Sequence, residues 1–459
     1  MDADRPIRRG FAAFATQAQD LAASSGADTI YAPATAPGRA AVGVLRVSGP
    51  RAAGVSRVLT GRPPPPPRTA VLRRLRAPAT GEEIDRALLL WFPGPCSATG
   101  EDVLELQHHG GAAVLAALLA ALAGVRGCRP ARPGEFTRRA FLAGKLDLTA
   151  AEGLADLVEA STRAQARVAL RQLEGELGRL YGRWREELID ALARVEAEID
   201  FAEDEGLSDA IARSVAPVLR RLHGEISGHL ADDRRGERLR SGVTVAVTGR
   251  PNVGKSSLVN LLAGREVAIV TAIAGTTRDV LEVPLDLDGV PVTLLDTAGL
   301  RETQDPIEVE GVARARHRSA AADLRLWLME PGEEAALKDA GTIPVINKID
   351  LAPKVPVPSG MLGISCRTGA GVADLLVVLG ARARDLVTDG STPALTRARH
   401  RAELTAAVKA LGRALAGPLE LALLAEEVRL AARAIGRITG AVGVEDVLDR
   451  VFATFCIGK

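Results

Sequence analysis

The sequence has few aromatic residues, few cysteines and no apolar segment long enough to cross a bilayer. Aromatic residues make up 3% of the 459 residues against an apolar fraction of 47%, so we expect largely aliphatic cores. The four cysteines form no C-x-x-C pair and no cluster with histidine, which argues against a zinc site and favours a reducing compartment. The longest apolar run, residues 112–125, is shorter than the about 20 residues that span a membrane. We therefore expect a buried helix there, no membrane partner and a cytoplasmic protein.

An excess of charge of either sign is also missing. The net charge of +1 excludes a general attraction to nucleic acid, so any contact with RNA must use a local patch. Only seven of the 58 basic residues are lysines, which indicates that lysine is retained where a compact ammonium group is needed. The length predicts roughly two to four domains.

Composition and periodicity change several times along the chain and predict its organisation. We expect a disordered extension over residues 1–27, where acidic residues argue against a targeting peptide. Short β-like runs with intervening helices follow over 28–147, and helical periodicity dominates 148–240. Strands alternate with helices over 241–386, and helical periodicity returns over 387–459. One helical domain with an inserted α/β domain explains this order, and two independent helical domains are the alternative.

Within the first helical segment, apolar residues recur every three or four positions. This spacing predicts a single long helix whose stripe consists of Leu173, Leu177, Leu180, Trp184, Leu188, Leu192, Val195 and Ile199. In the N-terminal segment, the proline-rich residues 61–68 predict a surface loop. His108 and His109 are adjacent in a β-like run, so we expect them to face opposite sides with structural roles.

A phosphate-binding loop opens the α/β segment. The run "VTVAVTGRPNVGKSS" predicts a strand, a glycine-rich turn and a helix that starts near Lys255. Gly249 and Gly254 let backbone N–H groups wrap around phosphates at the start of that helix. Lys255 would reach the outer phosphates, and the Ser256 hydroxyl would bind Mg²⁺.

Two later motifs select the nucleotide. In "LLDTAGL", which follows a hairpin turn at Asp288-Gly289, Asp296 would hold Mg²⁺ through water and the Gly299 amide would sense the γ-phosphate. In "NKID", the carboxylate of Asp350 would accept both N1–H and N2–H of guanine, a pair that adenine lacks. The sequence therefore predicts GTP binding, with "ISCRTGAG" as the loop behind the guanine.

The nucleotide motifs are similar to those of the translation-factor-related GTPases, which carry the pattern T-x-x-x-G-T-T-R-D. Here it is "TAIAGTTRD", and the resemblance implies that Thr277 completes Mg²⁺ coordination. Leu300 stands where many GTPases have a water-orienting glutamine, so both water positioning and positive charge must come from elsewhere. The whole expected GTP-binding set is Asn252, Val253, Gly254, Lys255, Ser256, Ser257, Thr271, Ala272, Ile273, Ala274, Gly275, Thr276, Thr277, Asp296, Thr297, Ala298, Gly299, Asn347, Lys348, Asp350, Ser365, Cys366 and Arg367.

Motifs outside the GTPase segment make the resemblance more specific. The runs "PGRAAVGVLRVSG", "TGEDVLELQHHGG", "RPGEFTRRAFLAGKLDLTAAE" and the C-terminal "FCIGK" resemble the MnmE (TrmE) family of tRNA modification GTPases. The resemblance covers residues 28–459 and implies an N-terminal α+β folate-binding domain, a helical domain and an inserted Ras-like G domain with a mostly parallel sheet. It also implies a homodimer that works on tRNA with the flavoprotein MnmG and a tetrahydrofolate derivative, in the 5-formyl or methylene form.

The same resemblance assigns further residues. It places folate contacts at Arg46, Glu105, Lys145 and Lys459, with an ordinary strand-end salt bridge as the alternative for Arg46 and an exposed strand position as the alternative for Glu105. It implies a K⁺ ion in the role of an arginine finger, with ligands Asn252, Thr271, Ile273 and Thr276, and the alternative for Asn252 is a turn cap. Glu308 would orient the water, with Glu310 as the alternative. Cys456 is either a packing residue or a functional thiol.

Two other functions compete with the enzyme that this family implies. A regulatory GTPase that binds ribosome or RNA would need basic clusters or a KH-type GxxG loop, and the sequence contains neither. A folate enzyme with a vestigial GTPase is disfavoured by the intact guanine and Mg²⁺ motifs.

Overall fold

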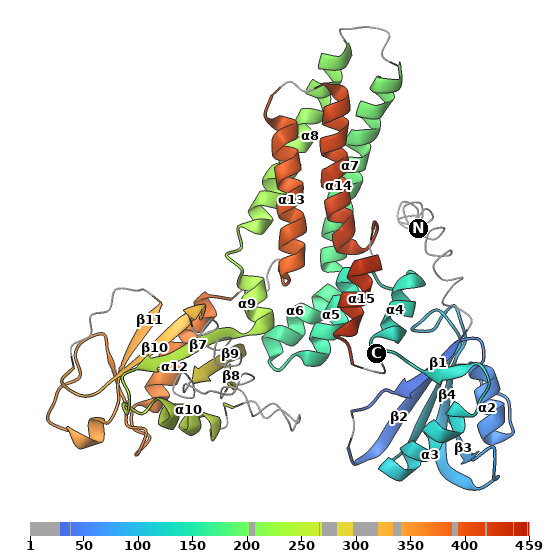
Figure 1. Ribbon diagram of the computed structural model, residues 1–459, viewed down its shortest axis with the longest axis horizontal. Helices are drawn as coiled ribbons and strands as arrows, with labels where there is room; N and C mark the ends of the chain where they lie inside the picture. Colours follow the sequence, from blue (N-terminus) through green and yellow to red (C-terminus); the bar gives the residue numbers. More distant parts are fainter. Residues whose placement is uncertain are drawn as a thin grey trace, which may run out of the picture. The chain divides into compact units, whose positions relative to one another are not determined.

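The computed structural model describes residues 28–36, 38–201, 207–265, 267–268, 282–296, 320–333, 341–387, 393–417, 420–443, 445–456 and 458. These residues form two compact units (Figure 1). The first unit draws its described residues from Met1–Ala155, Gly178–Arg185 and Ile435–Lys459, and the second from Asp156–Leu177 and Glu186–Ala434.

The first unit contains a six-stranded sheet that is antiparallel except at one edge. Its strand order is β3 (Val71–Arg76), β4 (Glu83–Phe92), β5 (Val103–Gly110), β2 (Ala40–Ser48), β1 (Thr29–Pro33) and β6 (Cys128–Pro130), with β1 and β6 parallel. The helices of this unit are α2 (Ala52–Thr60), α3 (Ala112–Ala123), α4 (Glu135–Leu142), most of α5 (Leu148–Glu159) and α15 (Glu445–Ala453).

Alternation along the strands separates the two faces of this sheet. Leu45 and Leu106 pack with α2 and α3 in an aliphatic core. The helix predicted over 112–125 is present as α3, but only Leu118, Ala121 and Leu122 are buried, so it is buried along one face and not as a whole. The helix lies on the sheet surface, and a helix in that position buries one face only. His108 is buried and His109 is exposed, as their adjacent strand positions predict.

A small aromatic cluster joins the C-terminal helix to the rest of the first unit. Phe141 of α4 lies 6.5 Å from Phe452 of α15, and Phe455 lies 5.4 Å from Phe452 between ring centroids. Beyond them, Gly458 is buried with φ +103°, and a Cβ there would stand 2.0 Å from the Pro33 carbonyl oxygen. The C-terminal segment therefore packs against the end of β1, at a position that only glycine fits.

The helices of the second unit come from both sides of the α/β segment. They are α6 (Arg163–Leu173), the later part of α7 (Glu176–Phe201), α8 (Leu207–Leu230), α9 (Arg235–Ser241), α13 (Ala398–Leu415) and the earlier part of α14 (Leu421–Thr439). Helices α8 and α13 lie side by side (Figure 1), and Arg401 of α13 binds Glu237 of α9 at 2.6 Å. The helical segments thus build one domain, into which the α/β domain is inserted.

The predicted single helix from Leu173 to Ile199 is instead two helices. Helix α6 ends at Leu173, α7 begins at Glu176, and Gly175 between them has φ +82°. On α7, several of the buried residues are also one position away from the residues predicted to be buried. Tyr181, Ala191 and Glu198 are buried, whereas Ile199 is 41% exposed. Periodicity alone cannot place such a break, because the apolar spacing continues across it.

The inserted domain has a mostly parallel six-stranded sheet, as the sequence predicts. Its order is β12 (Leu362–Gly363), β11 (Thr342–Ile346), β10 (Leu324–Met329), β7 (Val243–Gly249), β9 (Val290–Asp296) and β8 (Glu282–Leu287), with only β8 and β9 antiparallel. Helices α10 (Lys255–Ala263) and α12 (Val372–Asp385) and a short 3₁₀ turn, η2 (Ile349–Leu351), complete its described part. The predicted hairpin turn lies at Asp288 and Gly289, both with positive φ.

Candidate functional site

The phosphate-binding loop joins β7 to α10 in a conformation that needs glycine at two points. Gly249, Asn252 and Gly254 have φ values of +141°, +65° and +101°. A Cβ on Gly249 would stand 2.3 Å from the Leu328 carbonyl oxygen, and one on Gly254 would stand 2.3 Å from Asn347 Nδ2. Such a run of left-handed residues turns successive backbone N–H groups toward one anion.

The residues that would hold the phosphates and Mg²⁺ gather at the carboxyl edge of the sheet. Lys255 Nζ lies 3.0 Å from the carbonyl oxygen of Gly249 and 2.8 Å from that of Arg250, so its ammonium group sits over the loop. Ser256 follows in the first turn of α10, where the helix dipole favours anions. Asp296, 1% exposed, ends β9 opposite Val247 of β7. A hydroxyl and a carboxylate are oxygen ligands that suit Mg²⁺.

The predicted guanine-binding residues form a hydrogen-bonded group. Asn347 Nδ2 donates to the Val253 carbonyl at 2.8 Å, and its Oδ1 accepts from the Cys366 N–H at 3.1 Å. Ser365 Oγ donates to Asp350 Oδ1 at 2.7 Å and holds that carboxylate in position. Buried Asn347 therefore fixes the phosphate loop and the loop behind the base in one geometry.

Lys348 and Asn252 connect the same two loops. Lys348 Nζ donates to the Asn252 carbonyl oxygen at 2.8 Å, and both residues have positive φ. The Asn252 side chain is exposed, so its amide oxygen is accessible to a cation. Val253 is buried, Ser257 and Arg367 are exposed, and burial raises the pKa of the Cys366 thiol, which favours the neutral form.

Several predicted site residues lie outside the described part of the chain. They are Thr271, Ala272, Ile273, Ala274, Gly275, Thr276, Thr277, Thr297, Ala298, Gly299, Glu308 and Lys459, together with Leu300 and Glu310. The predicted roles of these residues therefore remain predictions.

In the first unit, the structure brings two predicted folate contacts together. Arg46 of β2 and Glu105 of β5 are register partners, and Arg46 Nη2 lies 2.9 Å from Glu105 Oε1. The Arg46 guanidinium also stands 5.8 Å from the ring centroid of Phe136 on α4. Both predicted residues are thus held by an ion pair, which was the alternative interpretation of Arg46. The Arg46 side chain is 28% exposed and that of Glu105 is 18% exposed.

The other predicted contacts come from loops. Lys145 is exposed and lies beside Gly100, since a Cβ built on Gly100 would stand 3.7 Å from Cε of Lys145. Gly458 packs against Pro33, whose register partner Leu45 precedes Arg46 in β2. Gly458 consequently lies close to β2, the strand that carries Arg46. Cys456 is exposed, which does not fit a packing role.

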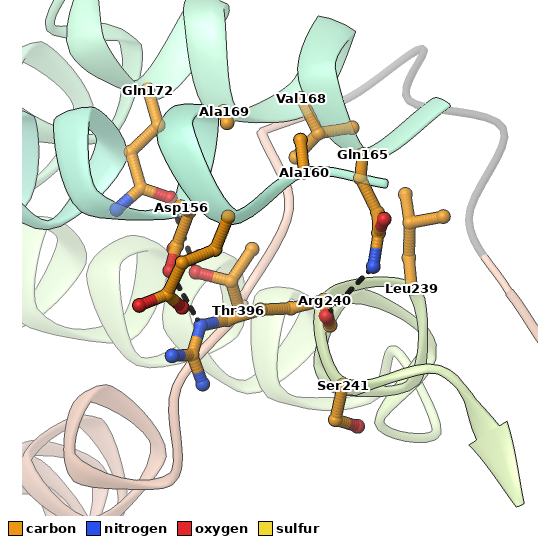
Figure 2. Close-up of a pocket in the computed structure, with 11 residues that line it drawn as sticks. Asp156, Ala160, Gln165, Val168, Ala169, Gln172, Leu239, Arg240, Ser241 and Thr396 are labelled. Carbon is orange, nitrogen blue, oxygen red and sulfur yellow. Dashed lines mark hydrogen bonds and ion pairs between the residues drawn. The ribbon is translucent and has the colours of Figure 1, made fainter. Parts of the chain in front are cut away.

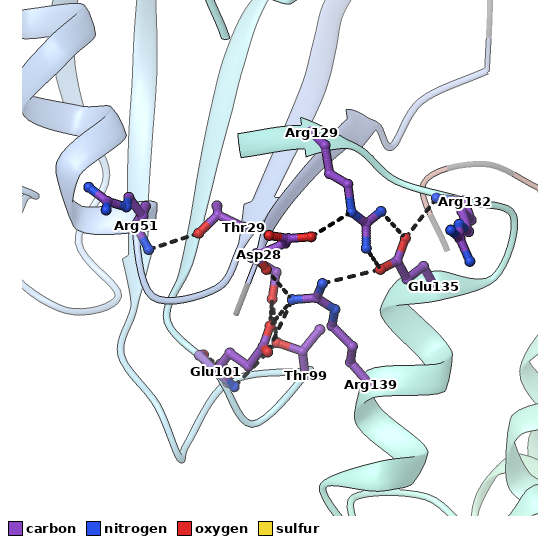
Figure 3. Close-up of polar contacts among 11 residues, drawn as sticks. Asp28, Thr29, Arg51, Thr99, Glu101, Arg129, Arg132, Glu135 and Arg139 are labelled. Carbon is purple, nitrogen blue, oxygen red and sulfur yellow. Dashed lines mark hydrogen bonds and ion pairs between the residues drawn. The ribbon is translucent and has the colours of Figure 1, made fainter. Parts of the chain in front are cut away.

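A charged network in this unit was missed by sequence analysis (Figure 3). Arg139, 7% exposed, donates to Glu101 at 2.9 Å and to Glu135 at 3.1 Å, and also to the Asp28 carbonyl at 3.0 Å. Arg129 pairs with Glu135 at 2.6 Å. The Glu135–Arg139 spacing of one helical turn was the available signal, but the other partners of Arg139, Glu101 and Asp28, are distant in sequence.

The network fixes the parts that surround Arg46. Glu101 Oε2 accepts a hydrogen bond at 2.8 Å from the hydroxyl of Ser48, which lies two residues after Arg46 in β2. Glu135 precedes Phe136, the ring beneath the Arg46 guanidinium. Burial raises the pKa of Glu135, but hydrogen bonds from Arg129 and the Arg132 N–H outweigh it and lower that pKa to about 2.

We expect Glu135→Gln to remove a pH-dependent part of the stability of this unit. The Glu135 pKa is lowered from 4.5 to about 2 in the folded protein, so its stabilisation is complete above pH 4.5 and is lost as the pH falls toward 2. The stabilisation amounts to about 3 kcal/mol at neutral pH. Hydrogen exchange of β1 and β2 amides, measured from pH 6 to pH 3, should show less pH dependence of the opening free energy in the variant.

The matched control is Glu82→Gln, which neutralises an exposed carboxylate next to β4. Its exchange profile should follow that of the wild-type protein. Equal pH dependence in Glu135→Gln and the wild-type protein would show that Glu135 titrates normally.

Together, the phosphate loop, the hydrogen-bonded residues of the guanine motif and the mostly parallel sheet define a P-loop GTPase, inserted here into a helical domain. The family model "MnmE helical domain" matches residues 148–456, and "GTP-binding protein TrmE N-terminus" matches residues 29–145. The chain belongs to the MnmE family of tRNA modification GTPases. Membership confirms the sequence-based resemblance, the fold class and the assignment as a GTP hydrolase that binds GTP with Mg²⁺.

Curated relatives match nearly the whole chain. The tRNA modification GTPase MnmE of Parvibaculum lavamentivorans is 54% identical over 440 residues, which cover 94% of this chain and 100% of the relative. The proteins of the same name from Methylobacterium sp. strain 4-46 and Rhodospirillum rubrum are 52% and 53% identical, over 94% of this chain and 100% and 99% of theirs. Throughout the described ranges, no helix has the length and apolarity needed to cross a membrane.

Proposed function

We propose that this chain is a K⁺-activated GTPase that modifies tRNA together with the flavoprotein MnmG. The reaction adds an aminomethyl or carboxymethylaminomethyl group to C5 of wobble uridine 34, and a tetrahydrofolate derivative supplies the one-carbon unit. The active form is a cytoplasmic homodimer that joins MnmG in a heterotetramer. The observation that carries this proposal is the match over 94% of the chain to tRNA modification GTPases.

Each part of the GTPase site has a defined task in this proposal. Lys255 places positive charge against the outer phosphates, and the N–H groups of the loop hold them. Ser256 and Thr277, with Asp296 acting through water, would hold Mg²⁺, which would supply positive charge next to the phosphates. Asp350, held by Ser365, selects guanine. Asn252 offers its amide oxygen to K⁺ beside the loop, with Thr271, Ile273 and Thr276 as the other ligands.

The Asn252→Ala variant tests the K⁺ assignment. We expect the wild-type protein to hydrolyse GTP much faster in K⁺ than in Na⁺, because a ring of oxygens sized for K⁺ fits the smaller Na⁺ poorly. The variant should lose this difference and largely retain GTP affinity, since the main phosphate contacts come from Lys255 and backbone N–H groups and the guanine contact comes from Asp350. Hydrolysis rates in matched K⁺ and Na⁺ buffers measure the first effect, and titration of a fluorescent GTP analogue measures the second.

Asn252 also has φ +65°, so a turn role must be separated from ion binding. Asn252→Gly keeps the left-handed turn without the side-chain oxygen and is the control. If Asn252→Gly retains the preference for K⁺, the side chain is no ligand. Equal wild-type rates in both salts would contradict the K⁺ proposal altogether.

The folate proposal combines an anionic and a cationic group of the first unit. The pterin ring carries N–H donors, which Glu105 can accept, and the glutamate tail is an anion that Arg46 and Lys145 attract. Both Arg46 contacts go to Glu105 Oε1, so the ion pair leaves Oε2 available for a further donor. Gly458 lies beside Pro33 and directly precedes Lys459 in the sequence, which makes Lys459 a candidate second cation for the glutamate tail.

We expect Lys459→Met to weaken folate binding while GTP hydrolysis stays unchanged. One charge-assisted contact is worth about 1.5 to 3 kcal/mol, which corresponds to about ten- to a hundred-fold in affinity. The substitution leaves Gly458 in place, whereas deletion of both residues would also remove its packing against Pro33. Calorimetric titration with 5-formyltetrahydrofolate measures the affinity, and phosphate release measures GTP hydrolysis.

The matched control is Lys409→Met, which changes a lysine of α13 in the same way and should leave both quantities unchanged. Unchanged folate affinity in Lys459→Met would exclude that lysine as a ligand.

The complete reaction tests the proposed function as a whole. Purified protein, MnmG, GTP, a tetrahydrofolate derivative and unmodified tRNA are incubated, and the nucleosides are then analysed by mass spectrometry. We expect a new C5-substituted uridine at position 34 that depends on every component. If GTP is hydrolysed but no modified uridine forms in any tRNA, the regulatory GTPase becomes the better explanation.

A further inference from the structure

A cavity of about 190 Å³ lies where the inserted G domain joins the helical domain (Figure 2). Its lining comes from the end of α5, from α6 and α9, and from the segment before α13. Figure 2 shows Asp156, Gln165, Gln172, Arg240 and Thr396 around this cavity. These elements include both covalent connections between the two domains.

One carboxylate in the cavity wall binds both connections. Asp156 Oδ1 accepts from Arg240 Nε at 2.8 Å and from Arg397 Nη2 at 2.7 Å. Arg240 lies in α9, just before β7 opens the G domain, and Arg397 directly precedes α13. The Asp156 side chain is 9% exposed, so water screens these ion pairs little.

Neighbouring contacts hold the two connections close together. Gln165 Nε2 donates to the Arg240 carbonyl at 3.0 Å, and Thr396 Oγ1 donates to Gln172 Oε1 at 3.1 Å. A Cβ on Gly236 of α9 would stand 2.5 Å from the Leu395 carbonyl oxygen. The two connections are therefore packed against each other and against α6.

Helix α6, which packs against the two connections, also contacts β9, the strand that ends in the proposed nucleotide site. Ala164 and Val168 of α6 pack against the apolar core of the G domain, which includes Val292 and Leu294 of β9. Strand β9 ends at Asp296, in the proposed Mg²⁺ site. A displacement of β9 would thus press on the helix that, with Asp156, holds the two connections.

We propose that Asp156 is a positioning residue that makes the helical domain follow the nucleotide state of the G domain. A single carboxylate paired with two arginines ties the two connections to each other so that they shift together, and a neutral side chain offers neither guanidinium group a counter-charge. Without it, the two connections lose the one charged group that binds both, so the remaining contacts hold them less firmly and pass on less of the G-domain movement. The consequence for tRNA modification rests on the proposed function, whereas the mechanical coupling does not.

The direct test measures distances within the second unit. Spin labels are attached through a keto amino acid introduced at Val377 in α12 and at Leu423 in α14, so the native cysteines stay unchanged. Both positions are exposed, at 71% and 54%. We expect the full-length protein to give one narrow distance distribution with GDP and a shifted one with GDP and aluminium fluoride in K⁺. Asp156→Asn should broaden both distributions and remove the shift.

Glu159→Gln is the matched control, since it neutralises a carboxylate that lines the same cavity one turn further along α5. It should behave like the wild-type protein. A narrow, nucleotide-dependent distribution in Asp156→Asn overturns the proposal. If Asp156→Asn does not fold, Arg397→Met takes its place, and a narrow distribution in that variant overturns the proposal equally.

Activity provides a second readout that a loss of folding would not imitate. Asp156→Asn should hydrolyse GTP at the wild-type rate, while the number of uridines modified per GTP falls about five-fold or more. Arg397→Lys, which keeps the charge, should fall between the wild-type protein and Arg397→Met. If the wild-type protein modifies no tRNA, the proposed function fails, and the distance measurement still decides the role of Asp156.

Discussion

The Asp350→Asn variant is expected to bind GTP about 10³-fold more weakly than the wild-type protein. The Asp350 carboxylate would accept hydrogen bonds from N1–H and N2–H of guanine, and Ser365 Oγ holds it in place at 2.7 Å. An asparagine presents one acceptor and one donor, so it faces one guanine N–H with its own NH₂ group. The loss includes both the missing hydrogen bond and the desolvation of two donors that then face each other.

The same variant should gain affinity for xanthine nucleotides. Xanthine carries an oxygen at position 2, which accepts from an asparagine NH₂ and is repelled by a carboxylate. Titrations of the wild-type protein and the variant with fluorescent GDP and XDP measure the change in preference. Asp374→Asn, an exposed carboxylate in the first turn of α12, is the control and should keep the wild-type preference. If Asp350→Asn still prefers guanine, this carboxylate does not read the base.

The Glu308→Ala variant should have a kcat for GTP hydrolysis that is lower by about 10²-fold or more. Leu300 follows the D-T-A-G motif and cannot orient water, so the reaction needs another polar group, and the family resemblance assigns Glu308. Its role would belong to the transition state, so KM for GTP should change little. Steady-state hydrolysis in K⁺ buffer separates kcat from KM.

Glu310→Ala is the internal comparison, because it removes a carboxylate two residues away in the same segment. It should retain near wild-type kcat. A large loss in Glu310→Ala with little change in Glu308→Ala would exchange the two assignments. A rise in KM without a fall in kcat would instead indicate a binding role for Glu308.

Local sequence patterns were sufficient for the G domain. Its phosphate loop, the guanine motif and the hairpin at Asp288-Gly289 depend on a few consecutive residues whose backbone demands are set locally. Gly249 and Gly254 are examples, since a Cβ at either position would collide with a neighbouring loop or strand. The mostly parallel sheet followed from the alternation of strands and helices.

Sequence patterns failed where a choice depended on neighbours distant in the chain. The apolar spacing that runs through Leu173 predicts one helix, although Gly175, with φ +82°, is a local signal for the end of α6. Packing then selects Tyr181 for the core instead of Leu180. The Arg46–Glu105 pair joins residues 59 positions apart, and Glu101 with Arg139 joins residues 38 apart. The sequence around a charged residue does not identify its partner, so these pairs can be recognised only in the folded structure.

The amino-acid sequence by itself determined the family and located the nucleotide motifs, because those features reside in short stretches of the chain. The tertiary structure alone decided how distant segments meet. It placed Gly458 against Pro33, built the network around Arg139, and brought Arg240 and Arg397 to the one carboxylate of Asp156. Arg240 and Arg397 stand on opposite sides of the inserted domain in sequence, and only folding of that domain brings them within reach of one side chain.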